Sequence, residues 1–415
     1  MSKLVRLAMV GCGGMAKGHL NAYKTIWARG GRNFNIVATC DVKRERAEDF
    51  ATQAEAFQGK KPRVYADIKD MLKDGDIDAV DIAAPHGFHH ILAVPCLEAK
   101  MDIMVEKPIG ITCKATRIIL DAAERSKRLV AVAENLRRYV GQRCVYWIIN
   151  EAKLLGNMRM FFAQKTGWYP MSLESEPMQW RGERLVGGGG LIFDSGAHYM
   201  DTIRYLFGDA DRVFAQMRTY ERRPFKHPER GEVVGDVEDS WTATIVFKSG
   251  VVGVWSYFPA ARGKALGHAV YYGDKGSFED LSGDIFHGLR TEGEVTFEDG
   301  KKRNFKDLEI EYLVRLTPEQ KAQLFPYGLT DGVQLECADF IDAVANRRKP
   351  DVDGLDGFKA KAIAIAIYES AWTGKSVLVD DVIEGKVDEY QKDINERWGM
   401  GAGASPAKKV SRKKK

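Results

Sequence analysis

Several hallmarks of other protein classes are missing from this chain of 415 residues. It has no apolar run near the ~18 residues that a membrane helix needs. Its first residues lead straight into an apolar strand, without the hydrophobic segment of a signal peptide. Its six cysteines show neither CxxC spacing nor a paired framework. These absences predict a soluble, cytoplasmic protein whose thiols are reduced.

Metal-binding spacings such as HxxEH are absent as well, so we expect no catalytic metal. Internal repeats are also lacking. The rest of the composition is ordinary, because a hydrophobic content of 45% and a charged content of 29% are typical of a globular protein. The length suits two domains with sizeable cores.

The net charge of +4 is concentrated at one end of the chain. The last eight residues, 408–415, carry six positive charges and no acid, and without them the chain is slightly acidic. Small, flexible residues precede them, so we expect 401–415 to be a disordered basic tail. This tail is either merely solvated or a weak arm for anionic partners. We expect no specific nucleic-acid partner and no membrane partner.

Residues 1–135 alternate short apolar runs with helical patterns. The sequence predicts strands over 4–10, 35–40, 79–83, 103–105 and 129–133, with helices over 15–28, 44–56, 89–99 and 113–126. This βαβ alternation is typical of an α/β domain with a doubly wound parallel sheet, a fold that binds nucleotides.

The regular alternation of apolar runs and helical patterns ends after residue 135. Helices are predicted over 143–154, 194–206, 333–345 and 358–372, and strands over 158–164, 212–219, 240–247, 251–257 and 269–272. We therefore expect residues 136–400 to form an α+β domain with a large, mainly antiparallel open sheet. The two late helices carry apolar positions with which they can pack back on the first domain.

A glycine-rich loop follows the first strand and opens the first helix, in the run Gly11-Cys12-Gly13-Gly14-Met15-Ala16. Gly11 allows a tight turn, and Gly13 removes a side chain where a pyrophosphate approaches the backbone. The small side chain of Ala16 lets helix and strand pack closely. A dinucleotide pyrophosphate is expected at this helix N-terminus, where free N–H groups favour an anion.

Asp41 ends the second strand, where a carboxylate would bind both hydroxyls of the adenosine ribose. Such a carboxylate repels a 2′-phosphate, so NAD is expected rather than NADP. Lys43 and Arg44 follow directly and can soften that preference. Alternatively, Asp41 only caps the helix that follows it.

Two further segments carry ionisable groups. Glu106-Lys107-Pro108 ends an apolar strand, and Asp194-Ser195-Gly196-Ala197-His198 follows four glycines. Oxidising an alcohol removes a hydroxyl proton while hydride leaves the same carbon, and histidine is the natural proton acceptor near neutral pH. His198 is therefore the expected base. Asp194, on the same helical face, can orient His198 or hold a substrate hydroxyl. Lys107 can stabilise the developing alkoxide, with a pKa lowered by shielding from water.

Each of these residues also has a purely structural interpretation. Asp194 could be a helix cap, Lys107 a surface lysine held by Glu106, and His198 a partly buried histidine with its hydrogen bonds satisfied. The role of Asp201 is left open. Jointly, and together with the glycine loop, the residues favour a site of hydride transfer that needs neither a metal nor a nucleophile.

On these motifs the chain resembles the Gfo/Idh/MocA oxidoreductases, the family named for glucose–fructose oxidoreductase and inositol dehydrogenase. The resemblance covers most of residues 4–375. It rests on the glycine loop with His19, Asp41, Ala84-Pro85 with His89, the segment Glu106-Lys107-Pro108, and the segment from Asp194 to Asp201. It implies an N-terminal Rossmann domain and a C-terminal α/β domain whose open sheet forms dimer or tetramer interfaces. It also implies hydride transfer between NAD(P) and a carbon-bound hydroxyl of a sugar or cyclitol.

Residue by residue, the resemblance implies Lys107, Asp194 and His198 as the catalytic residues. The cofactor-binding residues expected are Gly11, Gly13, Gly14, Met15, Ala16, Asp41, Pro85, His86, His89, Glu106 and Lys107. His86 stands where many relatives carry Asn, so contacts near the nicotinamide are expected to differ.

Substrate contacts are expected from the three catalytic residues and from Asn135, Lys165, Trp180 and Arg181. Aromatic faces and arginine donors suit a polyhydroxylated substrate, although a loop tryptophan is as often a packing anchor. The aromatic-rich loop over 167–184 hints at a substrate larger than a free monosaccharide, such as a glycoside.

The sequence therefore predicts an NAD-dependent oxidoreductase that takes hydride from a secondary hydroxyl of a sugar, glycoside or cyclitol. Two alternatives stay open. One is a redox-neutral enzyme that cleaves glycosides while its NAD is recycled, and the other is a non-catalytic sugar or dinucleotide sensor on the same fold. The presence of both Lys107 and His198 counts against the sensor.

Overall fold

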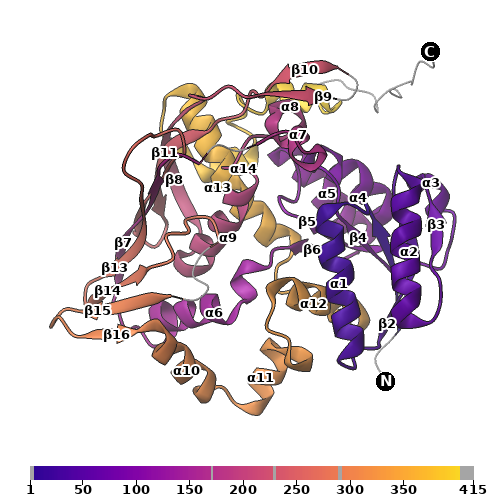
Figure 1. The fold of residues 1–415 in the computed structure, drawn as a ribbon, viewed down its shortest axis with the longest axis horizontal. Coiled ribbons are helices and arrows are strands. Elements are labelled where there is room, and N and C mark those ends of the chain that lie inside the picture. Colours follow the sequence, from indigo (N-terminus) through magenta and orange to yellow (C-terminus); the bar gives the residue numbers. More distant parts are fainter. Residues whose placement is uncertain (1–3, 170–171, 228–229, 288–291, 402–415) are drawn as a thin grey trace.

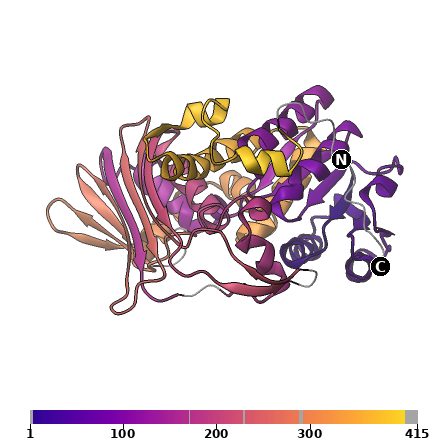
Figure 2. The same cartoon turned by 90° about the horizontal axis from the view of Figure 1, so that it is seen from above.

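The computed structural model describes residues 4–169, 172–227, 230–287 and 292–401. Apart from Gly401, the basic tail expected over 401–415 lies outside these residues. Two sheets dominate the molecule, one toward each end of its long axis, with helices between and around them (Figure 1, Figure 2).

The first sheet has six strands in the order β3-β2-β1-β4-β5-β6, all paired in parallel. Its strands are β1 (Val5–Val10), β2 (Phe34–Cys40), β3 (Arg63–Tyr65), β4 (Ala79–Ile82), β5 (Asp102–Glu106) and β6 (Val130–Ala133). The connecting helices are α1 (Gly14–Ala28), α2 (Arg44–Gln58), α3 (Ile68–Met71), α4 (His89–Glu98) and α5 (Cys113–Ser126), with the 3-10 turn η1 (His86–Phe88). This order confirms the predicted doubly wound parallel sheet.

The strands of this sheet are short apolar runs because both of their faces are covered. Leu7 and Met9 of β1 join a cluster of buried side chains that includes α1 and α2. Ala8 and Val10 point the other way, into a second cluster with α4 and α5. Side chains alternate across a strand, so a run that is apolar at every position indicates a strand buried on both faces.

The second sheet has nine strands in the order β16-β15-β14-β13-β7-β12-β11-β8-β17. They are β7 (Met158–Thr166), β8 (Ala210–Arg218), β11 (Ser240–Phe247), β12 (Val252–Phe258), β13 (Leu266–Gly273), β14 (Gly276–Asp280), β15 (Gly293–Phe297), β16 (Lys302–Asn304) and β17 (Val377–Leu378). β7 and β12 pair in parallel, and the other seven pairings are antiparallel. The predicted large, mainly antiparallel sheet is therefore confirmed. A separate ribbon consists of β9 (Pro224–His227) and β10 (Gly231–Val234).

Helices of the second half cover the inner face of this sheet and reach the first one. They are η2 (Leu136–Arg138), α6 (Val140–Tyr146), the π turn η3 (Trp147–Glu151), α7 (Glu176–Gln179), η4 (Trp180–Gly182), α8 (Arg184–Gly187), α9 (Ser195–Phe207), α10 (Phe305–Arg315), α11 (Pro318–Leu324), η5 (Pro326–Gly328), α12 (Gly332–Asn346), α13 (Gly354–Thr373), α14 (Val379–Glu384) and α15 (Lys392–Arg397). α12 packs on α1, and α13 contacts α9, β8 and α5. As predicted, the late helices pack back on the N-terminal sheet.

Several elements escaped the sequence patterns. β3 is three residues long, which is too short for a periodic signal, and its side chains are partly exposed. The strands β14 and β15, the edge strands β16 and β17, and the helices α10 and α11 were also not predicted. The helix expected over 143–154 begins earlier, at Val140, and changes into the π turn at Trp147.

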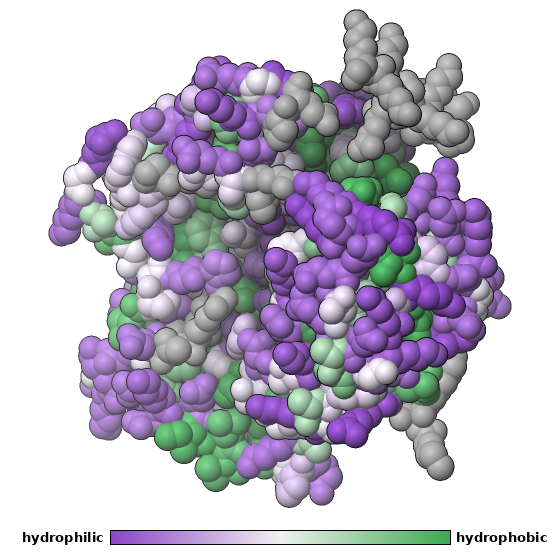
Figure 3. Space-filling view, turned by 45° about the vertical axis from the view of Figure 1, so that its right-hand side comes forward, coloured by the Kyte–Doolittle hydropathy of each residue, from purple (hydrophilic) through white to green (hydrophobic). Residues whose placement is uncertain are grey.

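No helix within the described residues is both long and apolar enough to cross a membrane. The face drawn in Figure 3 is largely hydrophilic, with apolar side chains gathered in smaller patches.

A substitution at Phe161 of β7 tests how much the packing on the inner face of the large sheet contributes to stability. Its ring is fully buried and contacts the rings of Phe207 and Tyr271. Phe161→Ala should lower the free energy of unfolding by about 3–5 kcal/mol, because the removed ring leaves a cavity. Urea unfolding checks this, with Tyr220→Ala as the control, since Tyr220 is 62% exposed. Equal losses in the two variants would contradict the packing described here.

Candidate active site

The candidate site lies where β1, β4, β5 and β6 end and the helices that follow them begin. Ligands of doubly wound sheets bind outside the carboxyl ends of the strands, at the point where the strand order reverses. In this sheet the reversal falls between β1 and β4. The glycine loop follows β1, His86 follows β4, Lys107 follows β5 and Glu134 follows β6.

The glycine loop has the backbone geometry that a dinucleotide needs. Gly11 has φ +85°, and a Cβ there would lie 2.2 Å from the carbonyl oxygen of Ala83. Gly13 precedes α1, and a Cβ there would meet no atom within 4 Å. Gly14 and Met15 are exposed at the start of α1, whereas Ala16 is buried against the sheet. The helix N-terminus is thus open to a ligand, while the turn before it is closed by the backbone of Ala83, which directly follows β4.

Asp41 lies beside the glycine loop, directly after β2. Its carboxylate accepts hydrogen bonds from the backbone N–H groups of Cys12 and Lys43, both at 2.8 Å. The N-cap of α2 is Lys43, so Asp41 is not the helix cap that the alternative interpretation required. The carboxylate therefore connects β2 to the loop that is expected to bind the pyrophosphate.

The segment after β4 contains Pro85, His86 and His89, and all three lie next to the sheet edge. His86 is buried, and its Nδ1 lies 2.8 Å from the carbonyl oxygen of Gly187. Burial lowers the pKa of His86 to about 3, so its ring is neutral. His89 lies between the carbonyl oxygens of Ala84 and Pro108, at 2.8 and 3.0 Å, which fixes the ring between two strand ends.

Lys107 forms the centre of the site, together with Asp194 and Arg181. The Lys107 ammonium donates to the carboxylate and to the carbonyl oxygen of Asp194, at 2.9 and 3.0 Å. Arg181 donates to the other carboxylate oxygen of Asp194 at 2.7 Å. Asp194 occupies the N-cap position of α9, but its side chain makes no capping hydrogen bond. The interpretation of Asp194 as a cap and that of Lys107 as a surface lysine are therefore both wrong.

The charged side chains of this group strongly shift one another's pKa values. Burial opposes the charge of Lys107, but Asp194 and Glu106 outweigh it and raise the pKa of the lysine. The expectation that shielding from water would lower this pKa is therefore wrong, because it left out the neighbouring carboxylates. Burial likewise opposes the charge of Asp194, and the cations Lys107 and Arg181 hold its pKa far below the usual range.

His198 projects from the first turn of α9 toward the end of β6. Its Nδ1 lies 2.6 Å from the carboxylate of Glu134. His287 lies on another side, with its ring centroid 6.0 Å from that of His198. Neither Glu134 nor His287 was predicted from the sequence, although Glu134 directly precedes the candidate Asn135. Asp194 was expected to orient His198 or to hold a substrate hydroxyl, but its carboxylate is bound to Lys107 and Arg181 instead.

Trp180 and Arg181, two of the residues predicted to bind substrate, lie beside His86 and Asp194. The guanidinium of Arg181 lies 4.2 Å from the centre of the Trp180 ring, and the same ring meets His86 edge-on at 4.6 Å. Asn135 directly follows Glu134, and its buried Oδ1 has no hydrogen-bond partner among the described residues. Lys165 is different, because its ammonium lies 5.3 Å from the ring of Tyr169, and among the described residues no hydrogen bond or ion pair joins it to Lys107, Asp194 or His198.

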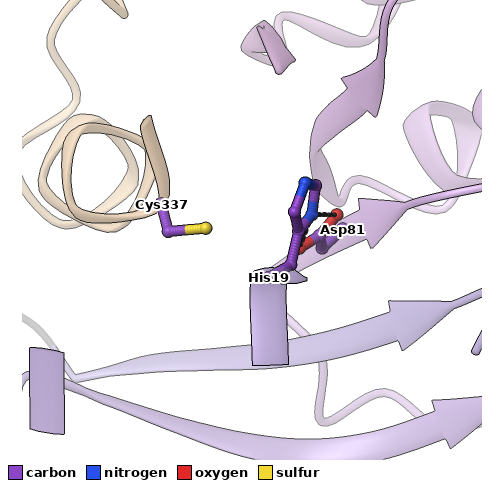
Figure 4. A group of neighbouring side chains, drawn as sticks. All are labelled: His19, Asp81 and Cys337. Carbon is purple, nitrogen blue, oxygen red and sulfur yellow. Dashed lines mark hydrogen bonds and ion pairs between the residues drawn. The ribbon is translucent and has the colours of Figure 1, made fainter. Parts of the chain in front are cut away.

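Behind Glu106 lies a fully buried polar network around His19. Nδ1 of His19 contacts both carboxylate oxygens of Asp81 at 2.9 and 3.0 Å, and Nε2 lies 3.1 Å from Glu106. Figure 4 shows the thiol of Cys337 pointing toward the same group from α12. His19, Asp81 and Cys337 are close enough together to hold a metal ion. Their atoms are already occupied, however, because Tyr23 bonds both Asp81 and Cys337, so we interpret the network as a support for Glu106.

Asp201 is a structural residue in this arrangement. Its carboxylate forms a two-point ion pair with Arg137, and both side chains are buried. Arg137 lies in η2 and Asp201 in α9, so the pair joins the end of the N-terminal sheet to the helix that carries His198.

A cavity of about 540 Å³ lies elsewhere, between α1, α11 and α12. None of the predicted site residues lines it. Its charged lining is already paired, since Arg138 binds both Asp339 and Asp351. We therefore do not consider the cavity a candidate active site, in contrast to the group around Lys107.

Two family models match the chain. A model of an oxidoreductase family with an NAD-binding Rossmann fold matches residues 5–134. A model of the C-terminal alpha/beta domain of the same oxidoreductase family matches residues 151–379. Together they cover most of the chain and both sheets, and they establish an NAD-binding Rossmann domain.

Among curated relatives, levoglucosan dehydrogenase of Pseudarthrobacter phenanthrenivorans is 26% identical over 398 residues, which cover 88% of this chain and 96% of that protein. The 1,5-anhydro-D-fructose reductase of Ensifer adhaerens is 25% identical, over 83% of this chain and 91% of its own length. The solved complex of levoglucosan dehydrogenase with NADH and levoglucosan has a TM-score of 0.70 at 23% identity, covering 90% and 98% of the two chains. The WlbA dehydrogenase from Bordetella pertussis, in complex with NADH and UDP-GlcNAcA, has a TM-score of 0.69 at 22% identity, covering 91% and 98%.

The two loop glycines should respond differently to an added methyl group. Gly11→Ala should lower the free energy of unfolding by about 1–3 kcal/mol, because its positive φ and the carbonyl of Ala83 exclude a side chain. Gly13→Ala should keep that stability but weaken NAD binding at least about tenfold, because its Cβ would project toward the pyrophosphate. Urea unfolding and calorimetric titration with NAD measure the two effects. Unchanged NAD affinity in Gly13→Ala would show that the pyrophosphate does not approach this residue.

Proposed function

We propose, since the chain belongs to the Gfo/Idh/MocA family of oxidoreductases, that it is an NAD-dependent dehydrogenase acting on a secondary hydroxyl of a sugar, glycoside or cyclitol. The observation that carries this proposal is that a part-buried lysine and a histidine lie at the carboxyl ends of neighbouring strands of the first sheet. Lys107 follows β5, and His198 meets Glu134 at the end of the neighbouring β6. The glycine loop opens at the same edge.

The residues of this chain divide the chemistry as follows. The ammonium of Lys107 lies where it can donate to the substrate oxygen and stabilise the alkoxide that forms as the proton leaves. His198 takes the hydroxyl proton at Nε2, the ring nitrogen that Glu134 leaves free. Asp194 keeps Lys107 charged and aimed. When bound, NAD supplies the acceptor for the hydride, so no metal is required.

The substrate class rests on the relatives and on the residues beside Lys107. Curated relatives are named for levoglucosan, 1,5-anhydro-D-fructose, glucose 6-phosphate and inositol. In this chain Trp180 offers an aromatic face and Arg181 offers hydrogen-bond donors next to Asp194. Such a wall suits a polyhydroxylated ring, and a glycoside fits the proposal better than a free monosaccharide. Asp41, with its carboxylate beside the glycine loop, favours NAD over NADP.

The division into domains and the assembly are part of the same proposal. We assign residues 1–135 to the cofactor and 136–400 to the substrate and to subunit contacts. The outer face of the nine-stranded sheet exposes Met160 of β7, Leu266 and Tyr272 of the neighbouring β13, and Phe214 of β8, which β12 and β11 separate from β7. Exposed apolar groups gathered on one face favour a contact between copies of the chain, as a dimer or tetramer.

A charged side chain introduced on that face tests whether the face forms the contact between subunits. Phe214→Glu should shift the mass measured by light scattering toward the monomer, because a carboxylate cannot be buried unpaired in an apolar contact. Val314→Glu is the control, since Val314 is 75% exposed on α10. An unchanged oligomer in the first variant would exclude this face as the contact.

The proposed activity is tested by NADH formation at 340 nm with NAD and a panel of sugars, cyclitols and glycosides. Lys107→Met should lower kcat by about 100- to 1000-fold while NAD affinity stays within threefold, because the lost charge acts on the alkoxide. Lys248→Met is the matched control, since Lys248 pairs with Asp380 at the surface. Wild-type protein that binds NAD but forms no NADH with any member of the panel would contradict a dehydrogenase.

A further inference from the structure

We propose that Glu134 is the positioning residue for His198, a role that rests on the proposed dehydrogenase function. Its carboxylate accepts the Nδ1 proton of His198 and thereby leaves Nε2 as the free base for the substrate hydroxyl. Asp194, the carboxylate expected from the sequence to orient His198, serves Lys107 instead.

The contact between Glu134 and His198 is short and shielded. The two side chains are 4% and 12% exposed, and Oε1 of Glu134 lies 2.6 Å from Nδ1 of His198. The same oxygen also accepts from the backbone N–H of Leu136 at 3.3 Å. Glu134 directly follows β6, and His198 lies in the first turn of α9, so both partners are fixed by regular elements.

Asp194 is not available for this role. One of its oxygens accepts from Lys107, and the other accepts from Arg181. His86 approaches the first oxygen as well, at 3.8 Å. A carboxylate held between two cations has its lone pairs directed at them and stays with them.

The charges that face His198 come from several elements. Glu134 approaches from the end of β6, Glu106 from the end of β5, and His287 from the segment after β14. Burial alone would raise the pKa of Glu134, but His198 and then Lys107 hold it below its ordinary value. Glu134 is therefore an anion next to the imidazole, and it can stabilise the imidazolium that forms when the hydroxyl proton arrives.

The chemical consequence follows from the two ring nitrogens of histidine. A neutral imidazole carries one N–H and one lone pair, and the partner of one nitrogen decides which of them the other presents. With Nδ1–H donated to Glu134, the lone pair is on Nε2. The hydroxyl proton moves to Nε2, and a bound nicotinamide would accept the electron pair of the breaking carbon–hydrogen bond as hydride. The oxidised carbon becomes a carbonyl, and the ring of His198 becomes an imidazolium paired with Glu134.

The variant Glu134→Gln tests this role, because glutamine keeps the shape of the side chain and removes its charge. kcat should fall by about 10- to 1000-fold, while KM and NAD affinity change less than about threefold. The acidic limb of the pH–rate profile should move to lower pH, because the imidazolium loses its counter-charge. Glu134→Asp should restore part of kcat, since it returns the anion with a shorter reach.

Glu336→Gln is the matched control. Glu336 is also buried, its Oε1 lies 3.6 Å from Nε2 of His19, and neither oxygen has a hydrogen-bond partner among the described residues. Burial raises its pKa well above the ordinary value, so the acid is neutral and an amide replaces it closely. This variant should keep both kcat and the acidic limb.

A readout without turnover separates this proposal from the proposed activity. In 15N spectra of histidine-labelled protein, neutral His198 should carry its proton on Nδ1, and Glu134→Gln should change that tautomer or shift the resonance of Nδ1. A wild-type protein that forms no NADH but shows this tautomer would contradict only the dehydrogenase. Spectra and a pH profile unaltered by Glu134→Gln would overturn the positioning role, even if kcat fell.

Discussion

The withdrawal of the Lys107 ammonium from water is the constraint on which the site depends. A buried cation is costly unless it is paired and hydrogen-bonded. Asp194 meets this requirement with its carboxylate and its backbone carbonyl, and Glu106 adds a second negative charge. Because Lys107 directly follows β5 of the first sheet and Asp194 directly precedes α9, the same ion pair that keeps the lysine charged also fixes the two halves of the chain against each other.

Two carboxylates share the work that a single residue was expected to do. Asp194 is committed to Lys107 and Arg181, and Glu134 meets His198. The separation gives each acid–base group its own counter-charge, so that a change at one does not have to disturb the other. The ion pair between Arg137 and Asp201 then joins η2 to α9 and keeps Glu134 and His198 at a fixed separation.

Support for these residues extends well beyond the strand ends. His19 connects Asp81 of β4 with Glu106 of β5, and α12 closes the network from outside. α12 packs on α1, and α13 spans from β8 to α5. The last third of the chain thus completes the N-terminal half. Its role in the site is to hold the sheet edge rather than to supply the acting groups.

The sequence by itself determined the glycine loop and five of the six strands of the first sheet, and it predicted that Lys107, Asp194 and His198 share one site. These features depend on short stretches of sequence. Apolar runs predict strands buried on both faces, and glycines at fixed spacing predict a tight turn before a helix. The sequence could not give the short edge strands, since a strand of three partly exposed residues such as β3 has no periodic signal. Only the tertiary structure decided which carboxylate faces which cation. Asp194 and His198 are four residues apart, yet Asp194 meets Lys107 and His198 meets Glu134, because pairing of buried charges depends on distance in space and not along the chain.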